Sequence, residues 1–512
     1  MRAHFARRSF LQGLPHLALL GWCGHLSSAP AQMPPMPSTA TAWRALSRLG
    51  YGPSPTLMAA LASARNTQDW ALQQIDMARA ASQLPPTIAA DLEQLHASLP
   101  ELFAAGQHER ELRLKIKDQA AAPAPQMTDT GSTALRRLDF SGPLMPEQFS
   151  LRLAQQTATW RLSSCSQPTL ENPLLARMTE FWFNHFNVFI GKGAVRPFVG
   201  HYLIHVIRAQ ALGKFEDLLL ASARHPAMLL YLDQAQSVAE GTPGAQGQVR
   251  GLNENYAREL MELHTLGVQG GYSQTDVREL ARVLTGWTIS PKEATGFRFA
   301  ARMHDTAPKR VLGQIFPTSA RAAGEQEGID AIRLLARHPA TARRISLRLA
   351  QFFVADEPSA ALQQQLSQTF LNTQGDIAAV LRTLFLSVDF WLPQNRLFKT
   401  PLDYVCSALT VTQSAASTDR RGLVLAMAYL ANAGQALHGW QTPDGYKTDA
   451  ATWLAPEALT RRADLAMALA QKPVDLSALQ AYLSENTRAA IAQEPLAMRA
   501  GLALASPDFM YK

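Results

Sequence analysis

The sequence NENYARELMELHTLG fills residues 253–267, and GYSQTDVRELARVLTGW follows at residues 271–287. Around the first stretch, apolar residues recur four or three positions apart at Leu252, Tyr256, Leu260 and Leu263. This spacing places them on one face of a helix. We therefore predict a helix over residues 254–266 that ends at Gly267.

The second stretch predicts another helix followed by a turn into strands. Ser273 and Asp276 have the spacing of a capping box at a helix start, and Gly286 marks the expected end. Two short runs follow, Trp287–Ile289 and Phe297–Phe299, with proline and glycine between them. We expect these runs to pair as a small β-hairpin.

Most of the remaining chain repeats the helical pattern. Ala, Leu, Arg and Gln are abundant, and apolar residues keep the three- and four-residue spacing. One long helix is expected over residues 86–117. The predicted fold class is all-α, a multi-helical globular body with a small β-hairpin insert near residues 287–300.

Changes in composition divide the 512 residues into four parts. Residues 1–31 have the features of a signal peptide, and residues 32–118 form an N-terminal helical region. Residues 119–133 are rich in Ala, Pro, Thr and Gly, which is typical of a flexible linker. Residues 134–512 are expected to form the main helical domain.

The N-terminal segment, residues 1–31, predicts where the protein is located. Arg7 and Arg8 stand directly before a polar and two apolar residues, an apolar run follows, and Ala-Pro-Ala closes the segment at residues 29–31. It resembles a twin-arginine export signal. The apolar run is shorter than the about 20 residues of a spanning helix. We therefore expect a periplasmic or secreted protein that uses the twin-arginine translocase and has no permanent membrane anchor.

Charge and cysteine content limit the class of function. The formal net charge is +7, and the basic residues are spread along the chain. No nucleic acid is therefore expected as a partner. Cys165 and Cys406 are the cysteines outside the leader. Two cysteines cannot form a cysteine zinc site, and the sequence leaves open whether they pair.

Further motifs accompany the central stretch. They are FWFNHF at 181–186, ALGKF at 211–215, PAMLLYLD at 226–233, His304-Asp305 with Lys309, FFV at 352–354, PDGY at 443–446 and ASPDF at 505–509. With residues 253–287 they resemble the bacterial family called domain of unknown function 1800, over most of the chain. Its members resemble exported proteins that often accompany a second twin-arginine family with a phosphatase-like or sulfatase-like fold. The resemblance thus implies an exported partner of that kind.

The central helix supplies the candidate catalytic residues, Glu259 and His264, which lie at the two margins of its apolar face. A partly buried glutamate needs a cation, and Arg282 on the next helix is the expected partner. On the polar face we expect i,i+4 salt bridges among Glu254, Arg258 and Glu262.

The candidate metal ligands are His185, His304 and Asp305. His185 falls in the middle of an aromatic helical face, where burial keeps an imidazole neutral and able to act as ligand or base. The alternative is a core histidine bonded to a backbone carbonyl. His304 and Asp305 follow the second strand, and adjacent His-Asp pairs occur in metal-dependent phosphohydrolases. The alternative there is a turn aspartate beside an exposed histidine.

Two functions remain open from the sequence. The preferred one is an accessory or partner protein of an exported, hydrolytic system, because no recognised catalytic motif is present. The other is a metal-assisted hydrolase in which His185, His304 and Asp305 act with Glu259 or His264. Such an enzyme would use a divalent metal, and its donors would have to converge on one position.

Overall fold

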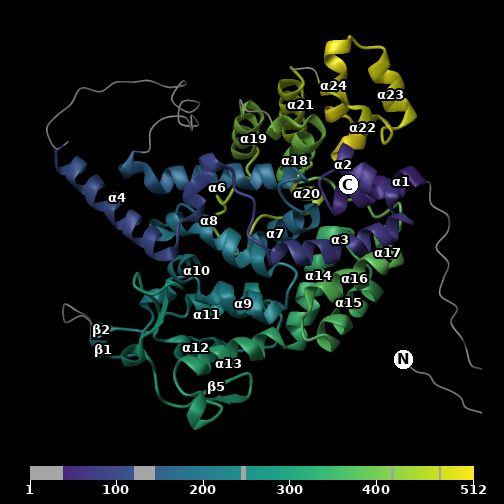
Figure 1. Ribbon diagram of the computed structural model, residues 1–512. Helices are drawn as coiled ribbons and strands as arrows, with labels where there is room; N and C mark the ends of the chain where they lie inside the picture. Colours follow the sequence, from purple (N-terminus) through teal and green to yellow (C-terminus); the bar gives the residue numbers. More distant parts are fainter. Residues whose placement is uncertain (1–37, 120–144, 244–248, 417–419, 472–473) are drawn as a thin grey trace, which may run out of the picture. The chain divides into compact units, whose positions relative to one another are not determined.

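The computed structural model describes residues 38–119, 145–243, 249–416, 420–471 and 474–512 (Figure 1). Helices dominate these residues, and the strands pair only into small antiparallel sheets. The predicted all-α class with a small β insert is confirmed. No helix in the described ranges is both long enough and apolar enough to cross a membrane. The predicted leader with Arg7 and Arg8, and residues 120–133 of the predicted linker, lie outside the described residues.

The chain begins with helices that pack on later parts of the fold. They are α1 (Ser38–Arg48), α2 (Pro55–Ser63), α3 (Thr67–Ser82) and α4 (Leu99–Gln119). The single helix predicted over 86–117 is wrong, because a separate 3₁₀-helix (Ala90–His96) precedes α4. Ser98 donates from its backbone N–H to the Glu101 carboxylate at 2.7 Å, and this contact starts a new helix.

A first hydrophobic core takes in helices from α1 to α17 and buries Trp182 and Trp287 completely. Besides the helices above and the short α8 (Val199–His201), its α-helices are α6 (Phe149–Ser166), α7 (Pro173–His185), α9 (Phe215–Arg224), α10 (Pro226–Tyr231), α11 (Asn255–Glu259), α12 (Gln274–Leu284), α13 (Glu325–Ala336), α14 (Pro339–Phe353), α15 (Ala360–Asn372), α16 (Ile377–Leu386) and α17 (Val388–Trp391). A π-helix over Tyr202–Arg208 continues α8 and also packs in this core.

A second hydrophobic core is centred on the C-terminal helices, green to yellow in Figure 1. They are α18 (Pro401–Thr412), α19 (Arg421–Asn432), α20 (Ala450–Trp453), α21 (Pro456–Leu469), α22 (Ser477–Gln480), α23 (Glu485–Ala492), α24 (Leu496–Ala505) and α25 (Pro507–Met510). Helix α6 contributes to both cores. A disulfide between Cys165 on α6 and Cys406 on α18 links it to the second core.

The predicted hairpin forms with the expected strands. β3 (Trp287–Ile289) pairs antiparallel with β4 (Phe297–Phe299), and Trp287 lies opposite Phe299. Sequence analysis missed two further hairpins. In one, β5 (Lys309–Val311) pairs with β6 (Gln314–Phe316). In the other, β1 (Thr242–Pro243) pairs with β2 (Val249–Arg250).

The predicted helix over 254–266 forms, but it is not regular. It is α-helical only over α11, and residues Leu260–His264 continue it as a π-helix. The wider turn is held by a hydrogen bond of 2.6 Å from the Thr265 hydroxyl to the Leu260 carbonyl. Gly267 ends the helix with a φ of +86°, as predicted, and its N–H donates to the Met261 carbonyl at 3.1 Å.

Candidate functional site

The FWFNHF motif forms the C-terminal end of α7, and His185 is its last helical residue. The His185 side chain is fully buried, and its ring lies against those of Phe181, Trp182 and Phe186. The predicted aromatic surroundings are confirmed. Burial first, and then the charges of Arg348 and Arg344, lower the pKa of His185 well below its usual value. The imidazole is therefore neutral at pH 7.

Both nitrogens of His185 have partners. Nε2 lies 3.0 Å from the carbonyl oxygen of His264, and Nδ1 lies 2.9 Å from a guanidinium nitrogen of Arg348. Arginine only donates, so Nδ1 must accept and Nε2 must carry the proton that goes to the carbonyl. His185 is thus bonded to a backbone carbonyl, which is the alternative stated above. It also orients Arg348.

His264 lies beside His185, with ring centroids 6.3 Å apart. It is buried at the end of the π-helix, and its Nε2 has no partner among the described residues. Burial first, and then Arg344 and Arg348, lower the pKa of His264 to about 3. Glu259 is half-buried, and burial followed by the charge of Glu262 raises its pKa.

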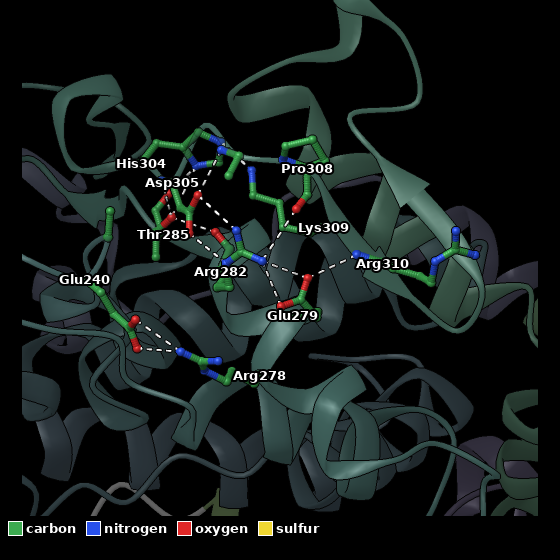
Figure 2. Close-up of polar contacts among 12 residues, drawn as sticks. Glu240, Arg278, Glu279, Arg282, Thr285, His304, Asp305, Pro308, Lys309 and Arg310 are labelled. Carbon is green, nitrogen blue, oxygen red and sulfur yellow. Dashed lines mark hydrogen bonds and ion pairs between the residues drawn. The ribbon is translucent and has the colours of Figure 1, made fainter.

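Arg282 does not pair with Glu259, and that prediction is wrong. Figure 2 shows Arg282 between Asp305 and Glu279, with its Nε donating to Asp305 at 2.7 Å and its Nη1 donating to Glu279 at 2.8 Å. Glu279 is one turn away on α12, and the loop after β4 places Asp305 against the same guanidinium. The predicted i,i+4 salt bridges on the polar face are confirmed, with Arg258 at 3.6 Å from Glu254 and 3.3 Å from Glu262.

His304 belongs to a buried ion-pair cluster rather than to the surface. Its Nδ1 lies 2.9 Å from the Thr285 carbonyl, and its Nε2 lies 3.1 Å from Glu327. Buried Lys309 donates to the other oxygen of Glu327 at 2.7 Å. Burial alone would raise the pKa of Glu327, but the hydrogen bonds from His304 and Lys309 lower it. The expectation of an exposed histidine beside a turn aspartate is therefore wrong.

Four of the five predicted site residues fall into two groups, and Glu259 belongs to neither. His185 and His264 come together at the end of α7, while His304 and Asp305 lie in the cluster formed by α12, β5 and α13. In the part of the chain that the structure describes, no three His, Cys, Asp or Glu side chains are grouped so that they could hold a metal ion.

Sequence reasoning missed a pocket that is lined by Arg348 and by residues of both hydrophobic cores. Its volume is about 50 Å³. It is lined by Arg161, Glu180, Phe181, Phe183, Asn184, Asn187, Arg348, Gln351, Phe352, Thr400, Leu402, Gln435, Ala436, Leu437, His438, Tyr446 and Thr448. The lining comes from α6, α7, α14 and residues 400–448.

Two arginines give the pocket its charge. The guanidinium of Arg161 lies over the ring of Phe183, 5.2 Å from its centroid, and Arg348 makes its hydrogen bond to neutral His185. Within the described ranges neither arginine forms an ion pair. Burial lowers the pKa of both, that of Arg348 to about 10, because desolvation disfavours a cation.

His438 lines the same pocket from a strained backbone position, and the charge of Arg161 reaches it. Its φ is +56°, a left-handed conformation that is uncommon outside glycine and that concentrates at functional sites. The side chain is 2% exposed, and neither ring nitrogen has a partner in the described residues. Its ring packs edge-on against Phe183 with centroids 4.8 Å apart. Burial, and then Arg161, lower the pKa of His438 well below its usual value.

The loop that carries His438 is held by the asparagines of α7 and the turn after it. The Asn184 amide donates to the Tyr446 carbonyl at 2.8 Å and accepts from the Tyr446 N–H at 2.7 Å. Asn187 donates to the Thr442 carbonyl at 2.8 Å. Gly445 has a φ of +74°, and a Cβ there would collide with the backbone oxygen of Asn184. The FWFNHF and PDGY motifs are therefore in direct contact, and together they form one wall of the pocket.

Comparison with known proteins gives one match. The family model described as Protein of unknown function (DUF1800) matches residues 44–511. No curated protein and no solved structure is significantly similar to the chain.

Proposed function

The chain belongs to the family of proteins of unknown function DUF1800, and from that premise we propose that it is an exported helical accessory protein that acts by binding rather than by metal-assisted hydrolysis. The proposed location is the periplasm or the exterior of the cell, reached through the twin-arginine translocase. Its proposed partner is an exported protein with a phosphatase-like or sulfatase-like fold.

One observation carries the binding proposal: the candidate metal donors already have protein partners. His185 uses one nitrogen on the His264 carbonyl and the other on Arg348. Asp305 is paired with Arg282, and His304 with Glu327. A metal ligand needs a free lone pair directed at the ion, so these contacts favour structural roles for the three residues.

The disulfide supports the proposed location. Cys165 and Cys406 are bonded to each other, and Cys406 is fully buried. Structural disulfides form and persist in oxidising compartments such as the periplasm, and they are rare in the reducing cytosol. This agrees with the export signal expected from Arg7 and Arg8.

Replacing Arg7 and Arg8 together by Lys is expected to reduce the exported protein by about tenfold or more, because lysine keeps the charge but not the guanidinium fork. The measurement is the ratio of exported to cytoplasmic protein by cell fractionation. Arg2→Lys is the matched control, since it changes a leader arginine outside the pair. Equal exported yields of the double variant and the control would reject this route.

The binding proposal predicts that the exported protein holds no stoichiometric divalent metal. Metal analysis of protein purified from the exported fraction, without chelator or affinity metal, checks this. One equivalent of zinc or another divalent ion, lost on replacing His264 by Gln, would instead support the metal-assisted hydrolase. His264 is the informative position because its Nε2 has no partner among the described residues.

A further inference from the structure

We propose that the pocket between Arg161 and Arg348 is a binding site for a small anion, a carboxylate or a tetrahedral oxyanion such as phosphate or sulfate. This goes beyond the proposed function, because it assigns a ligand class to a site of its own and holds wherever the protein is located.

The first argument is the charge of the pocket. Arg161 and Arg348 are partly buried, and in the described residues neither forms an ion pair. The charge of Glu180 acts on Arg161 and that of Asp444 on Arg348, but neither carboxylate is in salt-bridge contact with the arginine. A partly buried cation without a paired counterion carries a desolvation cost, and a bound anion would reduce that cost. Arginine is also the side chain best suited to this ligand, because its planar fork matches the oxygens of carboxylate and phosphate groups.

The acidic residue in the lining does not cancel this charge. Glu180 is buried, and its Oε2 accepts hydrogen bonds from the Tyr51 hydroxyl at 2.5 Å and from Arg177 at 3.3 Å. Arg177 thus supplies the positive charge opposite Glu180. Arg161 and Arg348 remain as the lining cations that have no ion pair among the described residues, although Glu180 and Asp444 act on them from a greater distance.

The second argument is His438. Its imidazole is neutral, so one ring nitrogen carries a hydrogen and can donate while the other can accept. Neither does so with any described residue, although the ring is 2% exposed and lines the pocket. Buried polar atoms in proteins nearly always have partners, so an unpartnered imidazole beside Arg161 in this lining favours a ligand oxygen at this position.

The third argument is the positioning of Arg348. His185 can accept a hydrogen bond from Arg348 only while it is neutral, and its other nitrogen is fixed by the His264 carbonyl. This pair of contacts sets the direction of one guanidinium. His185 is therefore a positioning residue for the proposed site, and this gives the FWFNHF histidine a role that needs no metal.

The size of the pocket limits the ligand. A volume of about 50 Å³ holds several water molecules, at about 10–15 Å³ each by the same measure. That is enough for one carboxylate, phosphate or sulfate group. A larger compound would have to present such a group at its end and leave the rest outside.

The test is calorimetric titration of the full chain with acetate, inorganic phosphate and sulfate in separate arms, with chloride keeping the ionic strength constant. We expect at least one of these anions to bind, and the stronger arm identifies carboxylate or oxyanion as the preferred group. Arg161→Gln and Arg348→Gln should each weaken that binding by about tenfold or more, because each removes a charged donor.

Arg343→Gln is the matched control, since Arg343 is also on α14 but is exposed and is not part of the lining. It should bind like the unchanged chain. His438→Asn serves as a variant that tolerates the positive φ, and it should weaken binding while circular dichroism shows an intact fold. Failure of all three anions to bind at tens of millimolar would overturn the proposal. So would equal binding by the Arg161, Arg348 and Arg343 variants.

Discussion

Reduction of the Cys165–Cys406 disulfide is expected to lower the free energy of unfolding by about 5 kcal/mol. The bonded residues are 241 positions apart, so the bond closes a very long loop in the unfolded chain. In the chain-entropy model, the stabilisation grows with the logarithm of loop length. The bond also joins α6, which packs in both cores, to α18 in the second core.

Guanidinium unfolding of the oxidised and the fully reduced chain, followed in parallel, measures this difference. The double variant Cys165→Ala with Cys406→Ala is the control, and its unfolding should not respond to reductant. An unchanged midpoint on reduction of the native chain would contradict the prediction and indicate that the unfolded chain retains contacts between the two segments.

Replacing Asp403 by Asn is expected to destabilise the fold by about 3–5 kcal/mol, the usual cost of leaving a buried charge unpaired. Asp403 is 2% exposed and forms ion pairs with Arg177, which is 0% exposed, and with Lys512 at 2.5 Å. The substitution keeps the shape of the side chain but removes the carboxylate partner of Lys512 and one of the two carboxylates paired with Arg177. Arg177 then faces Glu180 alone.

The same residue predicts a pH dependence. Burial alone would raise the pKa of Asp403, but the charges of Arg177 and Lys512 hold it well below the usual value of about 3.9. A carboxyl group with a depressed folded-state pKa stabilises the fold above its unfolded pKa and loses that contribution as the pH falls toward the folded value. The difference in stability between the native chain and Asp403→Asn should therefore be largest near about pH 5–6 and shrink below about pH 4. It should also shrink toward pH 8, because the pKa of Lys512 is lowered to about 8 and falls further without Asp403.

Unfolding midpoints between pH 3 and pH 8 check both statements. Glu262→Gln is the control, because Glu262 forms a partly exposed i,i+4 pair with Arg258 and should cost only about 0.2–0.5 kcal/mol. The assignment of Asp403 as a paired, buried carboxylate would be refuted by either of two results. One is an equal loss of stability in the two variants, and the other is a stability difference between the native chain and Asp403→Asn that grows as the pH falls.

The features that could be predicted from the sequence are those set by neighbouring residues. The capping box at Ser273 and Asp276 forms, and its hydrogen bonds join residues three positions apart. The β3–β4 hairpin and the glycine end at Gly267 are also local. The π-helix at 260–264 was not predictable in this way, because part of its support comes from Arg344, which reaches the Leu263 carbonyl from α14.

The pocket was even less predictable from the sequence than the π-helix. Arg161 and Arg348 have the sequence context of ordinary helical arginines, which usually face solvent, and no spacing connects them with His438. They meet only because α6, α14 and the loop before α20 pack around the end of α7. The choice of Arg282 as the partner of Glu259 failed for a related reason: Asp305 arrives from a loop whose path the sequence did not specify.

The distance along the chain between Cys165 and Cys406 also determines whether folding or disulfide formation comes first. A protein exported by the proposed twin-arginine route crosses the membrane folded, and it leaves a reducing compartment for an oxidising one. The two thiols must then be brought face to face by helix packing alone, including the Arg177–Asp403 pair that joins α7 to α18. On that route the bond would be made last and would preserve an arrangement that already exists, so the form that crosses the membrane would be the less stable, reduced one.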